Sequence, residues 1–317
     1  MKFAIKTAIF ICLVAAAACS RNKDEAVGSG QEGSGNYPGR VMFTAAGTIY
    51  SIDLNTKIQD VHFRYNSYSF ANWDMSFDGK FRLTSDDETG TTSTTIFKVV
   101  KAEDGSIIDE FKFTPAYGTS SKHSGFLSPD NSMILINPDA DNGLVIVNRK
   151  GEILYQFRGI NNERFDYGDG AIWMPDGSLL FNFNDKILRS YPPFSTLTQV
   201  KEMNYENWGN LSVSRDGKQL ALYIGDHIYT MNADGNNLNQ VTQSNNIENL
   251  AKFSPDGKHI LVGINYLHLP NTGSKWDLAV LPNDGKKYDI DNDPAVMKVD
   301  ATNDFTPSVS GRCMWIP

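Results

Sequence analysis

A short pattern recurs five times along the chain, and this repeat constrains the fold more than any other feature of the sequence. In each copy an apolar stretch leads into a turn that contains Asp, and a second apolar stretch follows. The turn residues are Asp78, Asp130, Asp176, Asp216 and Asp256, separated by 52, 46, 40 and 40 residues. Periods of this length are typical of proteins in which each repeat forms a four-stranded sheet.

Each copy has the composition of a strand, a tight turn and a second strand. In AKFSPDGKHILV, from Ala251, Pro suits the first central turn position and Gly tolerates a positive φ. Between copies another alternating apolar strand runs into a further turn, as in GLVIVNRKGE from Gly143. A sixth, degenerate copy is PSVSGRCMWI from Pro307. Four short strands in each of six periods predict an all-β fold, a six-bladed β-propeller of four-stranded antiparallel blades.

The two ends of the repeat region predict how the ring closes. The region begins with strands expected at residues 40–44 and 48–54, and it ends on an inner-strand copy expected at residues 306–310. We expect the N- and C-terminal strands to complete one blade together, because a linear array would leave open sheet edges.

The first 18 residues have the features of an export signal. Lys2 and Lys6 precede a short apolar core, and small residues lie directly before Cys19. This arrangement resembles the bacterial lipobox, which implies cleavage before Cys19 and acylation of that cysteine. The alternative is an ordinary secretory signal. In the lipobox pattern, Ser20 after the cysteine implies the outer membrane.

Three segments are therefore predicted. They are a lipoprotein signal peptide at 1–18, an acylated Cys19 with a flexible tether at 19–39, and the propeller at 40–317. The tether is rich in Gly, Ser and charge and has almost no apolar residues, so it cannot form a core. The expected location is the bacterial cell envelope, anchored by lipid to the outer membrane on its periplasmic or surface side.

Charge and cysteine content limit the partners and the sources of stability. The formal net charge is −8, and it becomes more negative when the two signal lysines are removed. Nucleic acid is not expected as a partner, because phosphate binding needs clustered positive charge. After processing, Cys313 would be the one free thiol, so no disulfide within the chain is predicted. We expect a monomer that contacts the membrane through its lipid anchor only.

The run IYTMNADGNNLNQVT, followed by AKFSPDGKHILVG, resembles the repeat of TolB-like, WD40-like propellers. The resemblance covers residues 39–317 and is strongest over residues 210–285. It is weakest in the first blades, where Phe77 replaces the Pro and Asn131 replaces the Gly of the turn. TolB itself has an α/β domain before its propeller, whereas the predicted tether occupies that place here. The resemblance therefore implies the propeller fold and is not extended to the partners of TolB.

The turn Asp residues are predicted to be structural. In a propeller they lie between the two inner strands of each blade, spread around one face, where each carboxylate can accept hydrogen bonds from its own turn. Aromatic residues at strand spacing are likewise predicted to pack inside the fold.

Ligand binding is expected on the opposite face, where the loops that lead into the inner strands surround the central channel. These loops mix acids, amides and aromatic residues, which suits a protein, peptide or glycan ligand or a cation. The candidate binding residues at this rim are Trp73, Lys122, His123, Asp169, Trp208, Glu248, Asn249 and Asp304. Two longer loops, from Ser85 and from Asn265, are expected to overhang the same face.

An acidic segment, DIDNDPAVMKVD, raises the question of a calcium site. It places Asp289, Asp291 and Asp293 at alternating positions, as a calcium loop does, but Pro294 stands where an EF-hand needs Gly. The preferred interpretation is a solvated loop and no cofactor. The alternative is a calcium ion or another divalent cation held by the three Asp residues.

Two functions are compatible with these observations. The first is a binding or scaffold module, because no GxSxG, P-loop or dinucleotide motif is present. The alternative is a metal-dependent polysaccharide lyase or hydrolase, since a pectin-degrading lyase family with a similar propeller holds a metal with channel histidines. Here His123 alone lies at an inner-strand entrance, so the binding module is preferred.

Overall fold

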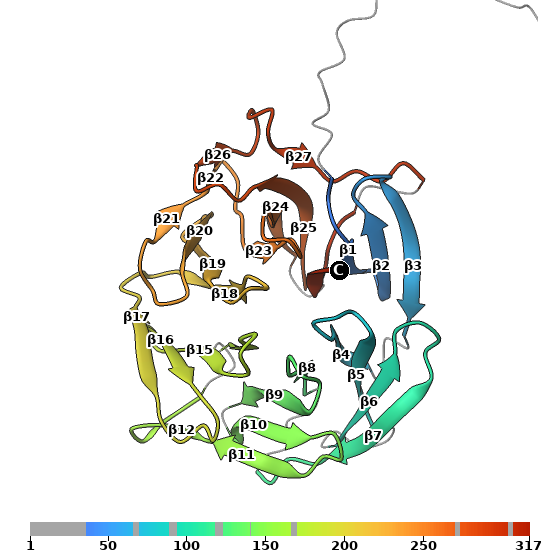
Figure 1. The fold of residues 1–317 in the computed structure, drawn as a ribbon, viewed down its shortest axis with the longest axis vertical. Helices are drawn as coiled ribbons and strands as arrows, with labels where there is room; N and C mark the ends of the chain where they lie inside the picture. Colours follow the sequence, from blue (N-terminus) through green and yellow to red (C-terminus); the bar gives the residue numbers. More distant parts are fainter. Residues whose placement is uncertain are drawn as a thin grey trace, which may run out of the picture. The chain divides into compact units, whose positions relative to one another are not determined.

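The chain folds into antiparallel sheets arranged as blades around a central axis (Figure 1). The computed structural model describes residues 36–65, 70–88, 94–117, 123–139, 141–165, 170–269, 273–303 and 307–317. These residues contain no α-helix and form six four-stranded blades, which confirms the predicted all-β propeller. No helix long and apolar enough to cross a membrane occurs in this part of the chain.

Each blade runs from an innermost strand at the ring centre to an outermost strand at the rim (Figure 1). The innermost strands are β28 (Cys313–Ile316), β4 (Phe70–Met75), β8 (Gly125–Leu127), β14 (Ala171–Trp173), β18 (Trp208–Val213) and β23 (Leu250–Phe253). The second strands are β1 (Arg40–Ala45), β5 (Phe81–Asp87), β9 (Met133–Asp139), β15 (Leu179–Phe183), β19 (Gln219–Ile224) and β24 (His259–Leu269).

The two outer positions of each blade complete the sheets. The third strands are β2 (Thr48–Asp53), β6 (Thr95–Lys101), β10 (Gly143–Asn148), β16 (Lys186–Ser190), β20 (His227–Asn232) and β25 (Gly273–Pro282). The outermost strands are β3 (Ile58–Arg64), β7 (Ile107–Phe113), β11 (Ile153–Phe157), β17 (Thr198–Glu202), β21 (Asn239–Gln240) and β27 (Met297–Lys298). Two short pairs lie outside the blades, namely β12 (Gly159–Ile160) with β13 (Glu163–Arg164), and β22 (Thr242–Gln243) with β26 (Tyr288–Asp289).

The ring closes through the two ends of the propeller, as predicted, but with a different C-terminal strand. β28 pairs with β1, and Phe43 lies opposite Cys313. The inner strand of this blade is therefore Cys313–Ile316, and the expectation of a strand at residues 306–310 was wrong. Val309 instead forms an isolated bridge with Trp276 of the neighbouring blade. Cys313 and Trp315 of the later segment enter the same core cluster as Val309, but the later segment is the one that pairs with β1, over four residue pairs.

The hydrophobic core is divided among the interfaces between successive blades. Six buried clusters are present in the described residues, one for each interface around the ring. The cluster that joins the last blade to the closing blade, for example, packs Leu261 and Val280 against Val41 and Trp315. Because every blade buries both of its faces, the interfaces hold the inner strands in fixed positions around the axis.

The repeated Ser and Asp residues stabilise the inner turns, as predicted for the Asp. In four copies the Ser hydroxyl donates to the Asp carboxylate, for example from Ser214 to Asp216 at 2.7 Å. The same carboxylate accepts the backbone N–H of Lys218 at 3.0 Å, and Ser214 Oγ accepts that of Gln219 at 2.9 Å. The next turn residue has a positive φ in all five copies, including Asn131. These carboxylates are therefore part of the turns.

One of the two long loops expected on the binding face is a strand extension. β24 and β25 continue pairing beyond a bulge, so that Leu267 lies opposite Lys275. The segment from Asn265 thus forms the end of a long hairpin. The segment from Ser85 lies mostly in the β5–β6 hairpin, in which Asp87 pairs with Thr95, and its residues 89–93 lie outside the described part.

Candidate functional site

A central cavity of about 560 Å³ runs between the innermost strands, and all six blades contribute to its wall. Alternate residues of a strand face opposite sides, so each innermost strand sends one set of side chains into the blade core and another toward the axis. One axis-facing residue from each blade lines the cavity: Asp74, Phe126, Ile172, Ser212, Lys252 and Met314. The wall is therefore mixed in chemistry even though the blades repeat.

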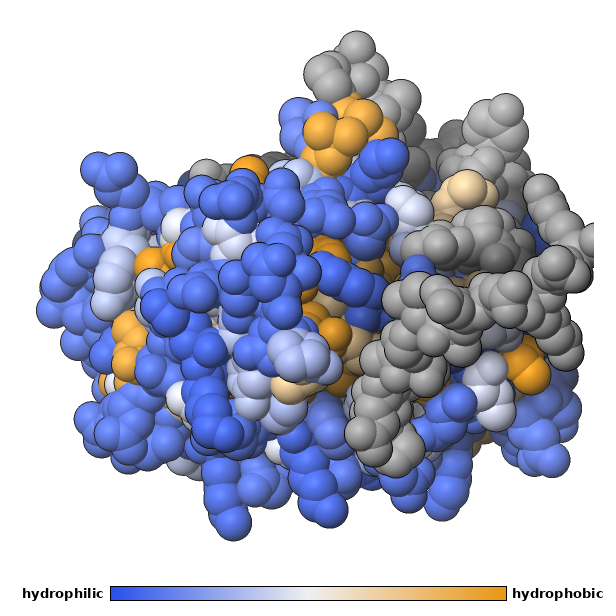
Figure 2. All heavy atoms as spheres, turned by 90° about the horizontal axis from the view of Figure 1, so that it is seen from above, coloured by the Kyte–Doolittle hydropathy of each residue, from blue (hydrophilic) through white to orange (hydrophobic). Residues whose placement is uncertain are grey.

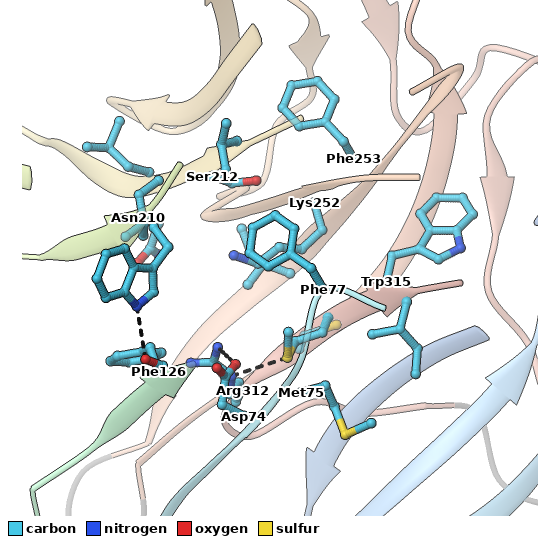
Figure 3. Close-up of a pocket in the computed structure, with 18 of the residues that line it drawn as sticks. Asp74, Met75, Phe77, Phe126, Asn210, Ser212, Lys252, Phe253, Arg312 and Trp315 are labelled. Atoms are coloured by element: carbon cyan, nitrogen blue, oxygen red, sulfur yellow. Dashed lines mark hydrogen bonds and ion pairs between the residues drawn. The ribbon is translucent and has the colours of Figure 1, made fainter. Parts of the chain in front are cut away.

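An ion pair occupies one side of this wall (Figure 3). The Arg312 guanidinium contacts the Asp74 carboxylate, and the other Asp74 oxygen accepts the backbone N–H of Leu127 at 2.8 Å. Arg312 also lies over the Phe126 ring, 4.5 Å from its centroid, and its Nε is 3.4 Å from Met314 Sδ. Burial raises the pKa of Asp74, while Arg312 opposes that shift. The charge of the Arg312 guanidinium is thus balanced by contacts within the protein.

Lys252 presents a second positive charge to the same cavity (Figure 3). Within the described part of the chain its amine has no hydrogen-bond or ion-pair partner. Burial, with a smaller contribution from the Arg312 charge, lowers the pKa of Lys252 to about 8, and Cys313 and Asp74 oppose the shift. Burial also raises the pKa of the Cys313 thiol to about 12, so this cysteine stays protonated at neutral pH.

Two polar atoms at the cavity wall lack partners. Asn249 Oδ1, an acceptor, and Trp276 Nε1, a donor, are both buried and form no hydrogen bond with any described residue. The backbone oxygen of Asn249, in contrast, accepts a hydrogen bond from Asn210 Nδ2 at 2.6 Å. An unpaired buried polar atom costs free energy, which a ligand or a water molecule at this position would recover.

Comparison with known proteins identifies the architecture. No protein-family model and no curated protein matches the sequence. Among solved structures, TolB from Acinetobacter baumannii is similar at 15% identity and a TM-score of 0.61, covering 89% of this chain and 68% of that chain. A putative TolB from Agrobacterium tumefaciens is similar at 14% identity and a TM-score of 0.54, covering 84% and 89%. The chain has the fold of a TolB-like propeller.

A chain of a Nidogen/Laminin complex is also similar to this TolB-like propeller, at 11% identity and a TM-score of 0.53, covering 78% of this chain and 93% of that chain. At these identities the likeness defines the fold and does not define a function, which depends on the residues of the cavity.

Two of the predicted rim residues lie inside the TolB-like propeller. Trp73 is buried between the closing blade and the next one, where its Nε1 donates to Thr44 Oγ1 at 2.8 Å. His123 is buried as well, with Nδ1 3.2 Å from Thr95 Oγ1 and its ring against Phe113. The strand alternation that puts the neighbours of Trp73 toward the axis directs its indole into the blade interface.

The next predicted rim residues divide between packing and the cavity. Trp208 is half-buried against the cluster between two blades. Glu248 is fully buried and accepts hydrogen bonds from His227 Nδ1 at 2.7 Å and Thr242 Oγ1 at 2.8 Å. Asn249 lines the cavity. Of the described rim candidates, Asn249 is thus the one that the structure brings to the cavity wall.

Several other predictions lie outside the described residues. These residues are Cys19, Lys122, Asp169 and Asp304.

The acidic segment forms a capped loop of the TolB-like propeller. Asp289 Oδ1 accepts the backbone N–H of Asp291 at 3.0 Å, and Asp293 Oδ1 accepts that of Ala295 at 2.9 Å. Hydrogen bonds, first from the Asn292 side chain, lower the pKa of Asp289. In the described part of the chain no group of three or more His, Cys, Asp or Glu side chains is placed to hold a metal ion. Cation binding here stays a prediction.

The sequence contains a signal for the cavity residues that our prediction did not use. In each of the five repeat copies the residue four positions before the turn Asp faces the axis: Asp74, Phe126, Ile172, Ser212 and Lys252. The residue after it was recognised as a conserved type, always apolar, because it packs in the blade core. Strand alternation makes its neighbour the channel residue, and that neighbour varies in chemistry because it lies on the cavity side of the strand, outside the apolar pattern that the copies share.

Proposed function

We propose that this protein is a non-enzymatic binding module of the bacterial cell envelope that holds a protein, peptide or glycan ligand at the mouth of its central cavity. The observation that carries the proposal is the cavity itself, with the unpartnered amine of Lys252 and the unpaired polar atoms of Asn249 and Trp276 on its wall. Such convergence of polar groups on a concave, partly apolar site is typical of ligand binding.

The outer surface of the propeller has fewer features of a binding site than the cavity has. In the view of Figure 2 its surface is mostly hydrophilic, with apolar residues scattered among polar ones. Exposed apolar side chains on the outermost strands lie in small groups, such as Ile107 with Ile108 and Ile153 with Leu154, which is ordinary for a protein surface. A protein ligand is favoured by the comparisons, since the similar structures include a chain from a Nidogen/Laminin complex.

A plugged cavity tests the proposal. Ser212 is a small residue on the cavity wall, so Ser212→Phe should fill the space without changing the outer surface. Chemical cross-linking of the intact protein in envelope preparations should trap a ligand protein with the wild type and lose it with Ser212→Phe. Ser195 is exposed in the loop between β16 and β17, on the outer part of its blade. Ser195→Phe is the matched control and should retain the cross-link. Equal cross-linking by all three chains would place binding elsewhere.

Anchoring is a separate part of the proposal. The signal-like segment 1–18 and the lipobox-like Cys19 support an acylated protein of the outer membrane. Radiolabelled palmitate should be incorporated by the wild type and not by Cys19→Ala. Labelling of the Ala variant would argue against Cys19 as the acylation site.

The lyase or hydrolase alternative stays a prediction. Metal analysis of the purified protein tests it, because a stoichiometric, tightly bound transition metal would favour that alternative over the binding module.

A further inference from the structure

The cavity carries a charge opposite to that of the whole protein. The described residues that line it include three cations, Lys252, Arg312 and Arg215, and one acid, Asp74. The chain as a whole has a formal net charge of −8. A positive lining inside an acidic protein attracts anions selectively into the cavity, since the surrounding surface repels them.

Only part of this positive charge is free to act on a ligand. Arg312 pairs with Asp74 and stacks on Phe126, so its fork of donors is already occupied. Lys252 forms no ion pair or hydrogen bond with any described residue, and it is a half-buried residue of the cavity wall. A buried charge without a counter-ion is costly, and an anion from outside would remove that cost.

We propose that Lys252 is the anchor of a carboxylate-binding site in the central cavity. This inference rests on the proposed binding function and names the chemistry of the ligand.

A single carboxylate fits the available donors better than a phosphate does. A phosphate dianion is usually matched by more than one charge, but on the innermost-strand wall the charge of Arg312 is balanced by Asp74, and Arg215 is an exposed residue of an inner turn. Lys252 provides one point charge, which balances one carboxylate. Phe126, Ile172 and Met314 add apolar side chains to a wall that also contains Ser and Asn residues, so a carboxylate attached to a partly apolar group suits the site.

The protonation state of Lys252 adds a pH dependence. Burial, and after it the charge of Arg312, lower the pKa of its amine to about 8, while Cys313 and Asp74, the other titratable groups that act on it, oppose this shift. Only the protonated amine attracts an anion, so affinity should fall as the pH rises through about 8. Bound carboxylate would in turn raise the pKa of Lys252, and binding above pH 8 would take up a proton.

The carboxylate could belong to a small free acid or to the end of a peptide chain. Isothermal titration at pH 7 with matched pairs separates these sources. The probes are phenylacetate with phenylacetamide, and Gly-Gly-Phe with its C-terminal amide. We expect each acid that fits to bind at least tenfold more tightly than its amide. Binding of phenylacetate alone would identify a small acid as sufficient, and binding of the tripeptide alone would identify a chain end.

Variants of the full propeller assign the effect to Lys252. Lys252→Met should weaken acid binding at least tenfold, and Lys252→Arg, which keeps the charge, should retain most of it. Lys258→Met is the control, since Lys258 is an exposed lysine on the turn of the same blade. A thermal melt of each variant checks that it is folded.

Three results would overturn the inference. They are equal binding of acids and amides, unchanged binding by Lys252→Met, and no binding of any probe by the wild type. Equal losses in Lys252→Met and Lys258→Met would also overturn it, because they would reflect net charge alone. The binding function proposed above is judged separately, by whether Ser212→Phe abolishes cross-linking of the ligand protein.

Discussion

At the scale of single residues, Arg312 and Lys252, two of the three cations that line the cavity, differ in what balances their charge. Arg312 has Asp74, the ring of Phe126 and the sulfur of Met314 around it. Lys252 forms no ion pair or ring contact with a described residue, and burial opposes its charge more than the nearby Asp74 favours it. A charged residue in such a position destabilises the folded protein, and a bound anion would reduce this cost, as is typical of functional positions.

The destabilisation by Lys252 should depend on pH. Its pKa falls from an ordinary 10.5 to about 8 on folding. Between these values the unfolded chain binds more protons than the folded one, so the contribution of Lys252 to stability improves as the pH rises from 8 to 10.5. Below pH 8 the cost is fully present. Lys252→Met should therefore raise the free energy of unfolding at pH 7, by about 2 kcal/mol, and by much less at pH 10.5.

Urea unfolding of the wild type and Lys252→Met at the two pH values measures this difference. Lys258→Met controls for loss of a surface charge and should shift both curves equally. A stabilisation by Lys252→Met that is the same at pH 7 and pH 10.5 would show that packing, and not desolvation of the amine, is responsible.

At the scale of elements, the repeated turn joins the first two strands of each blade through a small hydrogen-bond network. In one copy Asp216 accepts from Ser214 Oγ and from the Lys218 backbone. These bonds, first that from Ser214, lower the pKa of Asp216. The turn is rigid because one carboxylate satisfies two donors that would otherwise face solvent.

Asp216→Ala should destabilise the protein by about 1 kcal/mol at pH 7, the usual contribution of such hydrogen bonds. Because the folded pKa is the lower one, the stabilisation is present above about pH 4 and is lost as the pH falls through the folded pKa. The melting temperatures of wild type and variant should therefore converge as the pH is lowered below about 4. Asp226→Ala, at an exposed turn of the same blade, removes the same charge and should have little effect at pH 7 or at low pH.

The elements that the sequence predicted correctly are those whose pattern is local. The inner turns, the third strands and the number of blades follow from alternation and from the Asp and Gly of each turn. The closing strand was misplaced because Val309 matches the repeat alignment, whereas its bridge to Trp276 depends on a neighbouring blade. Similarly, the segment from Asn265 was expected to be a loop, but β24 and β25 pair along it as far as Leu269 and Gly273.

The candidate site was less predictable than the fold. Rim residues such as Trp73 and His123 were chosen by their place in the chain, and the structure directs them inward because alternation decides the side that each faces. The cavity residues Lys252 and Asp74 could have been found by the same alternation. The approach of Arg312 to Asp74 could not, because it joins the last strand to a blade more than 200 residues earlier in the chain.

At the scale of the whole molecule, stability depends on closing the ring. β28 is a short strand, yet it supplies the innermost position of one blade and packs Trp315 into an interface core. Without it, one blade loses its inner strand and two interfaces are exposed to water. Deletion of residues 313–317 should lower the melting temperature by more than 10 °C by calorimetry, since buried apolar area is lost at two interfaces. Deletion of Pro317 alone should have a small effect.

The pairing of Phe43 with Cys313 allows the closure to be fixed covalently. Thr44 N–H donates to the Arg312 carbonyl at 2.9 Å, which makes Phe43 and Cys313 a non-hydrogen-bonded pair. The Cα atoms of such pairs are about 4.5 Å apart, within the range of disulfides. In the chain from Ser20 onward, Phe43→Cys should therefore form a disulfide with Cys313 under oxidising conditions.

This bond would enclose nearly the whole propeller in one covalent loop. Loop-closure entropy predicts that it stabilises the folded chain by roughly 5 kcal/mol relative to the reduced form of the same variant, a comparison that cancels the loss of the Phe43 ring. Met42→Cys is the control, because the adjacent side chain faces the other side of the strand and should not reach Cys313. If the oxidised Phe43→Cys chain melts no higher than its reduced form, separation of β1 from β28 is not the step at which the ring opens.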